Sequence, residues 1–380
     1  MDFAELNSLG AGSIPAQLTT KTNIMKTETL PPNSTIPKEI SRVKFGIDPT
    51  SDKLHLGHLV PLRIVKSLKE LGHTIDIVLG SFTAMLGDPS EKDKMRPMLS
   101  DVETKANAES ILIQVKRILG SDINIHFNHT WFEKMSLPEM MNIISKFNVN
   151  HLLSRDSFQN RIKNNNSIGL HELLVPILQG LDSVELKSDI EIGGTDQLFN
   201  FMISREMQEK SGLKPEICLF APIINGLDGR KMSKSLNNCI FINDSPEDVF
   251  GKTMSISDET MFEWVKVFLN EPKNSHPFEL KKELAFSITE EIWGTDLSIK
   301  AREHFSSVIL SKNIPDDIQE IKCSDIISVV CLIRKSSKTV ARNLLISNAV
   351  KVNGDNATLE TSLKQGDVVK IGKLDFAKMI

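Results

Sequence analysis

Tyrosine is absent from this chain of 380 residues, although the chain contains 18 phenylalanines. An ordinary chain of this length would carry several tyrosines. Cysteine is scarce as well, and the four cysteines form no C-x-x-C pair (Cys218, Cys239, Cys323 and Cys331). This spacing argues against a disulfide framework or a zinc site and suits reduced thiols in a cytoplasmic protein.

Long apolar segments are also missing. No run reaches the roughly 18–20 apolar residues that a membrane-spanning helix needs. The first 40 residues contain no Arg and no charged segment followed by an apolar one. We therefore expect neither a secretory signal nor an organelle transit peptide, and the sequence predicts a cytoplasmic protein with no membrane partner.

Positive charge is not in excess, because the formal net charge is −4. The distribution is uneven, however: residues 323–380 hold nine Lys and Arg but only five Asp and Glu. A small basic segment on an acidic body can bind phosphates locally. On charge alone, an ordinary solvated surface remains the better interpretation.

The pattern of apolar residues predicts an α/β fold. A short strand over 43–47, a helix over 58–71 ending at Gly72, and a strand over 75–79 form a βαβ unit. Ligands of such sheets bind outside the carboxyl ends of the strands. We further expect helices over 104–119 and 136–180, a strand over 216–224, helical structure over 245–320, and a helix before a short β segment at 350–354.

These patterns divide the chain into four segments. Residues 1–40 read as a mostly irregular arm, rich in Ser, Thr, Pro and Asn. Residues 41–240 read as a Rossmann-like domain with a helical insertion, 241–322 as a helical domain, and 323–380 as a small α+β domain.

A histidine motif, His55-Leu56-Gly57-His58, lies where the first loop enters the helix. A helix N-terminus offers unpaired N–H groups and a positive dipole end, which suit a triphosphate. Gly57 permits close approach of a ligand to the backbone. Two surface histidines, or half of a metal site, explain four residues alone about equally well.

A lysine motif, Lys231-Met232-Ser233-Lys234-Ser235, follows a loop punctuated by glycines. Two lysines three residues apart on such a loop can neutralise a pyrophosphate leaving group in the transition state. A solvated basic loop is the usual explanation for an isolated K-x-x-K. The order of the two motifs along the chain changes this balance.

Both motifs, in this order, resemble those of class I aminoacyl-tRNA synthetases. Further blocks narrow the resemblance to the bacterial-type tyrosyl-tRNA synthetases: 46–50 (GIDPT), 83–90 (TAMLGDPS), 178–183 (LQGLDS) and 192–197 (IGGTDQ). Residues 337–372 resemble an S4-type RNA-binding domain. The resemblance covers roughly residues 43–373.

The resemblance implies an ATP-dependent, AMP-forming ligase that joins L-tyrosine to tRNA(Tyr). It implies a homodimer that uses ATP with Mg²⁺ and needs no protein-bound metal. The expected catalytic residues are Thr50, His55, His58, Lys231 and Lys234. The expected ATP-binding residues are Gly46, Asp48, His55, Gly57, His58, Gly194, Asp196, Lys231, Met232, Ser233 and Lys234, with Lys92 and Arg96 contacting phosphates from a mobile loop.

Tyrosine binding is expected at Phe45, Asp88, Val175, Gln179, Asp182 and Gln197. Val175, Gln179 and Asp182 are spaced to share one helix face. Asp182 could accept a hydrogen bond from a phenol hydroxyl, and Gln179 and Asp88 could hold an α-ammonium. An isolated carboxylate near a helix end is often only structural, but the block around Asp182 favours the binding role.

RNA binding is expected at Lys338, Arg342 and Lys351.

Two departures from the family leave alternatives open. The family commonly has Tyr at the positions of Val175 and Leu181, so the substrate could differ. A chain without Tyr could also be a backup or resistance isoform, made when charged tRNA(Tyr) is scarce. A catalytically inactive RNA-binding homologue is a third possibility.

Overall fold

The computed structural model describes residues 27–86, 100–269, 272–273, 276–307, 318–322, 325–353, 355–372 and 375–380. The chain forms two compact units. The first comprises residues up to Asp244 together with Ser255–Leu284, and the second comprises Ser245–Met254 together with Ala285–Ile380. The division of the chain into four segments remains a prediction.

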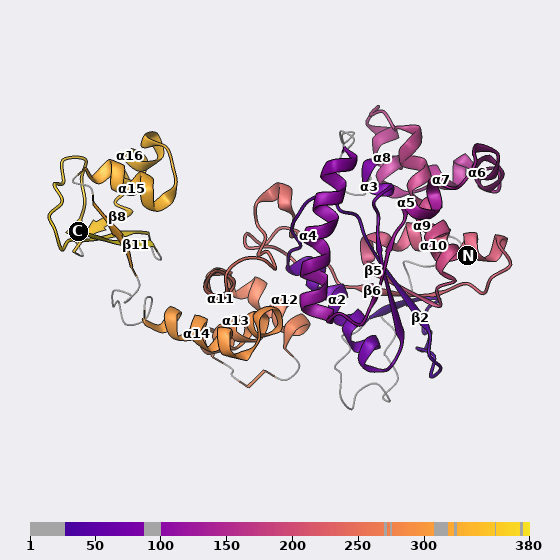
Figure 1. Ribbon diagram of the computed structural model, residues 1–380, viewed down its shortest axis with the longest axis horizontal. Helices are drawn as coiled ribbons and strands as arrows, with labels where there is room; N and C mark the ends of the chain where they lie inside the picture. The colour runs from indigo at the N-terminus through magenta and orange to yellow at the C-terminus, as the bar shows by residue number, and fades with distance from the viewer. Residues whose placement is uncertain are drawn as a thin grey trace. The chain divides into compact units, whose positions relative to one another are not determined.

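A six-stranded sheet, in the order β1-β6-β5-β2-β3-β4, forms the centre of the first unit. Figure 1 labels three of its strands, β2, β5 and β6. The strands are β1 (Glu28–Leu30), β2 (Arg42–Ile47), β3 (Thr74–Leu79), β4 (Asn124–Phe127), β5 (Ile190–Gly194) and β6 (Ile217–Ala221). All neighbouring pairs are parallel except β1 with β6. The strand order reverses between β2 and β5, which opens a crevice at their carboxyl ends.

The predicted βαβ unit is confirmed. Helix α2 (Leu56–Glu70) connects β2 to the parallel strand β3. Its apolar face is buried against the sheet, and the chain leaves the helix through Gly72 at φ 93°. The strand predicted over 216–224 is also confirmed, as β6.

Three strands of this sheet were not predicted. Residues Glu28–Leu30 form β1, within the arm that the sequence indicated as irregular, because three residues are too few for a periodic signal. β4 carries polar residues, and β5 ends in two glycines, so neither has a clear apolar run. Yet β5 pairs directly with β2 and provides half of the crevice.

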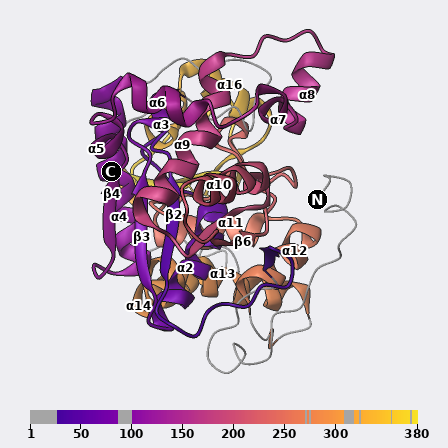
Figure 2. The ribbon, with the colours of Figure 1, turned by 90° about the vertical axis from the view of Figure 1, so that its right-hand side faces the viewer.

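Helices occupy the predicted ranges 104–119 and 136–180 (Figure 2). The helices of this part of the chain are α3 (Thr83–Leu86), α4 (Asp101–Leu119), α5 (His129–Phe132), α6 (Leu137–Ile144), α7 (Val149–Leu153), α8 (Asp156–Lys163), α9 (Leu170–Leu186) and α10 (Leu198–Lys210). Of these, α3, α5 and α10 lie outside the predicted ranges. α9 packs closely on α10 at Gly180, where an added Cβ would lie 3.0 Å from the Cβ of Met207. This contact fixes the helix that carries the predicted tyrosine-binding face.

The helices predicted over 245–320 are present as α11 (Pro246–Ser255), α12 (Asp258–Phe268), α13 (Pro277–Trp293) and α14 (Thr295–Phe305). The prediction is wrong at its end, because Gln319–Ile321 forms strand β7, which pairs in parallel with β11 (Asp375–Met379). Residues 308–317 lie outside the described ranges.

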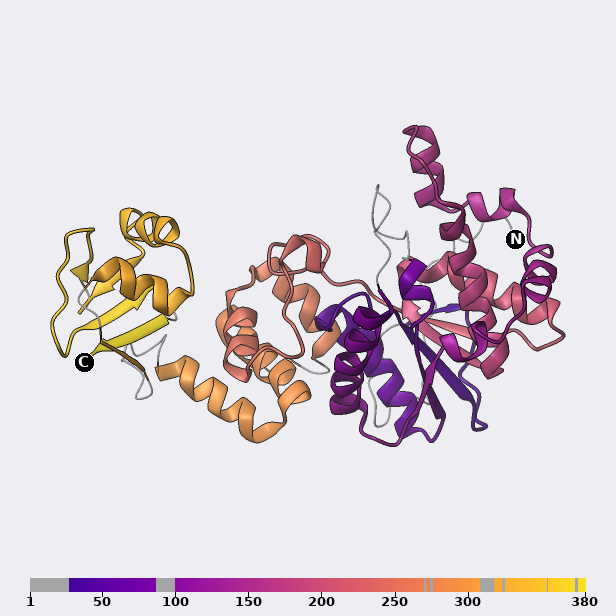
Figure 3. The same ribbon diagram turned by 45° about the horizontal axis from the view of Figure 1, so that its top comes forward.

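The end of the second unit is a small α+β module (Figure 3). Its sheet runs β7-β11-β10-β8-β9, with β8 (Val350–Val352), β9 (Asp355–Asn356) and β10 (Val368–Ile371). Helices α15 (Ile326–Arg334) and α16 (Lys338–Ile346) share an apolar core with the sheet. The predicted helix and the following β segment are thus confirmed as α16 and β8.

Among the residues that the structure describes, no helix combines the length and apolar character needed to cross a membrane.

Candidate active site

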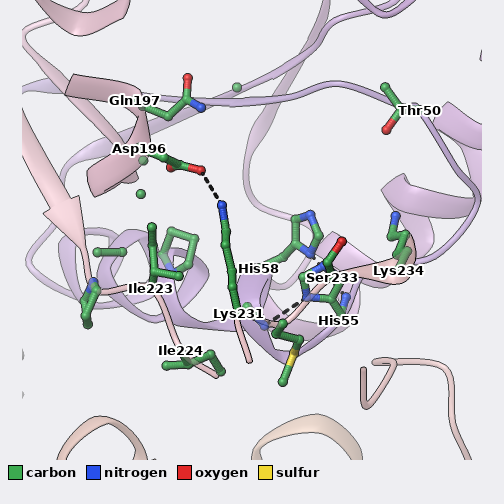
Figure 4. A pocket seen from close by; sticks show the side chains of 18 of the residues that line it. Thr50, His55, His58, Asp196, Gln197, Ile223, Ile224, Lys231, Ser233 and Lys234 are labelled. Carbon is green, nitrogen blue, oxygen red and sulfur yellow. Dashed lines mark hydrogen bonds and ion pairs between the residues drawn. The ribbon is translucent and has the colours of Figure 1, made fainter. Parts of the chain in front are cut away.

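Two adjoining cavities lie at the carboxyl ends of β2 and β5, where the strand order reverses. Figure 4 shows residues that line the larger one. The larger has a volume of about 710 Å³ and the smaller of about 280 Å³. They share several lining residues: Phe45, Gly46, Thr50, His58, Gly193, Asp196 and Gln197. The crevice therefore offers one large and one small compartment in direct continuity.

The histidine motif closes the N-terminus of α2 with its own side chains. Nδ1 of His55 accepts a hydrogen bond from the backbone N–H of Gly57 at 3.1 Å. Nδ1 of His58 accepts one from the backbone N–H of His55 at 3.2 Å. Because both Nδ1 atoms accept, each neutral ring carries its proton on Nε2 and can donate it to a ligand.

Gly57 is needed for a reason that the sequence did not reveal. A Cβ at this position would lie 2.9 Å from the ring of His55. Any other residue would therefore displace the imidazole that caps the helix. Burial lowers the pKa of His55, and the nearby His58, Lys234 and Lys231 lower it further. His55 is thus a neutral donor, not a cation.

The lysine loop reaches across the larger cavity. Nζ of Lys231 lies 3.2 Å from Oδ2 of Asp196, an ion pair drawn in Figure 4. Nζ of Lys234 donates to the hydroxyl of Ser51, which follows β2. Both lysines therefore lie opposite the ends of β2 and β5. A polyphosphate bound at these strand ends would be within reach of both ammonium groups.

Asn238 shapes this loop and was missed by the sequence analysis. Its side-chain amide donates to Oδ1 of Asp228 at 2.7 Å and to the carbonyl of Lys231 at 3.1 Å. Its Oδ1 accepts from the backbone N–H of Ser233 at 2.8 Å. Asn238 is only 2% exposed, so one buried amide holds both sides of the lysine motif. No short motif marks such a residue.

Asp182 lies at the buried end of the smaller cavity. Its Oδ1 accepts from the indole N–H of Trp131 at 3.0 Å, and its Oδ2 from the side chain of Asn128 at 3.4 Å. Burial raises the pKa of Asp182 to about 7, although Lys44 and these two donors oppose the rise. The sequence missed Trp131 and Asn128, which are remote from Asp182 along the chain.

Val175 and Gln179, the other two predicted residues of α9, also line the smaller cavity. Val175 is almost fully buried, and it leaves an apolar wall where the resemblance indicates a tyrosine hydroxyl. Leu181, the second such position, is buried in the core between α9 and α10. The absence of tyrosine therefore extends into the candidate site.

Asp48 joins the ends of two strands. Its Oδ1 accepts from the hydroxyl of Thr83 at 2.7 Å. Gly80 lies directly beside this bond, since an added Cβ would come within 1.9 Å of Oδ1 of Asp48. Asp48 lines the smaller cavity, and the ATP-binding role that the resemblance implied for it stays a prediction.

The structure brings most predicted site residues together. The larger cavity is lined by Phe45, Gly46, Thr50, His55, Gly57, His58, Gly194, Asp196, Gln197, Lys231, Met232, Ser233 and Lys234. It adds Ile223 and Ile224, which follow β6 and were not predicted. Asp88, Lys92 and Arg96 lie outside the described residues.

The predicted RNA-binding residues belong to the second unit. Lys338 and Arg342 lie on α16, and Lys351 lies on β8. All three are exposed to solvent. Their roles remain a prediction.

The model of the family "tRNA synthetases class I (W and Y)" matches residues 37–308, and the chain belongs to this family. It is 37% identical to the tyrosine–tRNA ligase of Thermotoga maritima, over 89% of this chain and 90% of that protein. The tyrosine–tRNA ligase of Oleidesulfovibrio alaskensis is also 37% identical, over 89% of this chain and 91% of its own.

A solved structure supports the fold. The C-terminally truncated mitochondrial tyrosyl-tRNA synthetase of Aspergillus nidulans superposes with a TM-score of 0.59, covering 69% of this chain and 84% of that one at 20% identity. The predicted Rossmann-like catalytic fold of a class I synthetase is confirmed by this likeness and by the family match.

Proposed function

We propose that this chain is a tyrosine–tRNA ligase. It activates L-tyrosine with ATP and transfers the tyrosyl group to tRNA(Tyr). The observation that carries the proposal is the continuity of two compartments: the histidine and lysine motifs face the larger one, and the smaller one ends at Asp182. A nucleotide in the larger compartment and an amino acid in the smaller one can thus meet where the two compartments join.

In the reaction, the tyrosine carboxylate attacks the α-phosphorus of ATP, and the bond to the β-phosphate oxygen breaks. Tyrosyl-adenylate and pyrophosphate form, and the terminal ribose hydroxyl of the tRNA then displaces AMP. Positioning and charge stabilisation provide the catalysis. Lys231 and Lys234 neutralise the leaving pyrophosphate, while Nε2–H groups of His55 and His58 donate to ATP oxygens.

The ribose is assigned to Asp196, which follows the two glycines of β5. In the described structure Lys231 pairs with this carboxylate, so ATP must exchange that contact for its own. Ile223 and Ile224 supply the apolar wall of the larger cavity. Mg²⁺ is proposed to enter with the ATP phosphates, which are the hard oxygen ligands that it prefers.

The phenol hydroxyl is assigned to Asp182, and the amino group to Gln179 together with Asp88. A phenylalanine ring would leave the buried carboxylate without its hydroxyl partner. Sites built to bond a hydroxyl reject the analogue that lacks it by about 10⁴–10⁵.

A homodimer is part of the proposal. Helix α6 has no buried residue, and it presents Leu137 and Met141 at 74% and 56% exposure. Leu170, the first residue of α9, is also 74% exposed. Large apolar side chains exposed to this degree are typical of a protein interface.

The C-terminal module is proposed to bind tRNA as an S4-type domain. Lys338, Arg342 and Lys351 supply exposed positive charge, and phosphate contacts dominate such affinity. Replacing all three with alanine should lower kcat/KM for tRNA in aminoacylation about tenfold. ATP–pyrophosphate exchange should keep its rate, since the first step needs no tRNA. A loss of exchange would contradict the assignment.

A cytoplasmic location is also proposed, because Cys218 and Cys239 are buried free thiols in the first unit.

Aminoacylation of tRNA(Tyr) with L-tyrosine and ATP tests the function directly. The wild-type chain should charge the tRNA, and Lys231→Ala should reduce kcat at least about 100-fold with little change in affinity for tyrosine. Absence of charging by the wild type would favour an inactive RNA-binding homologue. Charging with another amino acid would favour a changed specificity. The absence of tyrosine keeps a backup isoform as a second candidate role.

A further inference from the structure

A group of buried charged residues lies behind the smaller cavity. Lys44 on β2 and Glu191 on β5 are each only 1% exposed, and Nζ of Lys44 lies 2.7 Å from Oε1 of Glu191. The two residues face each other in the register of the neighbouring parallel strands. The ion pair therefore joins the two strands that form the crevice.

The ion pair is also attached to α9. Nζ of Lys44 donates to the backbone carbonyl of Gln179 at 3.1 Å and to the hydroxyl of Ser183 at 2.5 Å. Ser183 in turn donates to Oε1 of Glu216 at 2.9 Å. The ammonium group of Lys44 thus donates hydrogen bonds to groups of α9 and links this helix to the sheet.

Burial alone would lower the pKa of Lys44, but the carboxylates of Glu191, Glu216 and Asp182 outweigh it and raise that pKa. Burial and the adjacent Glu191 raise the pKa of Glu216. Lys44 is therefore a cation, and its ammonium group contacts the side chain of Glu191.

Glu191 makes a second contact, which reaches the substrate compartment. Its Oε1 accepts a hydrogen bond from Nε2 of Gln179 at 3.1 Å. A carboxylate can only accept, so it determines which end of the Gln179 amide faces it. The amide nitrogen is taken by Glu191, and the carbonyl oxygen remains for the cavity that Gln179 and Glu191 both line.

We propose that Glu191 is a positioning residue for the amino-acid substrate: held by Lys44, it fixes the Gln179 side chain as an acceptor and so selects a ligand with an α-ammonium group. This inference rests on the proposed tyrosine function. The requirement is chemical, because a freely turning amide could equally present its NH₂ and would then repel an ammonium. The pocket needs this constraint because Val175 supplies no hydroxyl there.

Two matched double variants test the role of the acceptor. Lys44→Met with Glu191→Leu removes the ion pair and the acceptor, and Lys44→Met with Glu191→Gln removes the ion pair but keeps an oxygen that can accept. Both variants remove the two charges of the Lys44–Glu191 ion pair together, so neither charge of that pair stays buried without the other. Thermal unfolding of both should be similar.

The measurement is the ratio of the dissociation constants of L-tyrosine and 3-(4-hydroxyphenyl)propanoate, which lacks only the amino group. The Leu variant should lose about tenfold of the wild-type preference for tyrosine, and the Gln variant should retain most of it. In a Gln179→Ala background the two variants should show the same ratio, because Glu191 acts through Gln179.

A purely structural role would weaken both ligands equally and leave the ratio unchanged, which would overturn the proposal. A Leu variant that fails to fold beside a folded Gln variant would likewise identify the acceptor as structural. If the wild-type chain binds neither ligand, the proposed tyrosine function fails together with the role of Glu191. Wild-type binding with an unchanged ratio in the variants overturns the role of Glu191 alone.

Discussion

Asp182 is the residue on which the amino-acid assignment depends, and its ionisation should be visible in substrate binding. Its pKa is raised to about 7, so the ionised fraction rises from about one tenth at pH 6 to about nine tenths at pH 8. The ionised carboxylate is the better acceptor for a phenol hydroxyl. Tyrosine affinity should therefore increase about tenfold over this interval, measured as Kd by calorimetry or fluorescence.

Asp182→Asn is the control for that experiment. Its amide does not titrate, so the affinity of this variant should be weaker and independent of pH between 6 and 8. The same inflection in Asp182→Asn would assign the titration to another group.

Val175 allows a gain of function to be predicted. Val175→Tyr restores a hydroxyl at the wall of the smaller cavity, and Val175→Phe adds the same ring without it. The Tyr variant should lower KM for tyrosine about tenfold relative to the Phe variant, the value of one hydrogen bond to a charged group. Equal KM values in steady-state exchange assays would remove this position from amino-acid recognition.

At this scale, the sequence identified the residues that belong to short motifs, such as His55 and Lys231. It did not identify Trp131 or Glu191, because their roles come from contacts between elements remote in the chain. Trp131 is 51 residues from the carboxylate to which it donates. A single sequence carries no local pattern for such a contact.

Among the elements, the lysine loop is the one whose shape depends on a single side chain. Asn238→Ala removes the amide that joins Asp228, Lys231 and Ser233. The loop should then place both lysines less accurately. We expect kcat of adenylate formation to fall about 10–100-fold, as for other lost transition-state contacts, with the Kd of tyrosine unchanged. Single-turnover kinetics separate these quantities.

The neighbouring Asn237→Gly is the matched control. Asn237 has a backbone φ of 51°, a conformation that glycine adopts easily. The rate of adenylate formation by Asn237→Gly should stay within about twofold of the wild-type rate. An equal loss in both variants would show that the loop responds to any substitution, and that Asn238 has no special role.

Elements with a clear pattern of apolar residues were predictable, as α2 and β3 show. β5 was not, because it places a charged residue and two glycines in a strand that is buried between neighbours. Those departures from a strand pattern coincide with the site. Glu191 supplies the buried ion pair, and an added Cβ at Gly193 would lie 2.6 Å from the ring of Phe201.

For the whole molecule, the exposed apolar side chains of α6 predict self-association. Leu137→Asp together with Met141→Asp should convert a dimer into a monomer, as measured by sedimentation. Ile113→Asp is a suitable control, because Ile113 is 64% exposed on a different helix, α4. Its mass should equal that of the wild type. Equal masses in all three proteins would contradict an interface at α6.

The central claim is that this chain activates tyrosine, and ATP–pyrophosphate exchange with single amino acids tests it most directly. We expect exchange with L-tyrosine, and a kcat/KM for L-phenylalanine that is lower by about 10⁴–10⁵, because Asp182 would lose its hydroxyl partner. Faster exchange with phenylalanine or another amino acid, or none with tyrosine, would contradict the account.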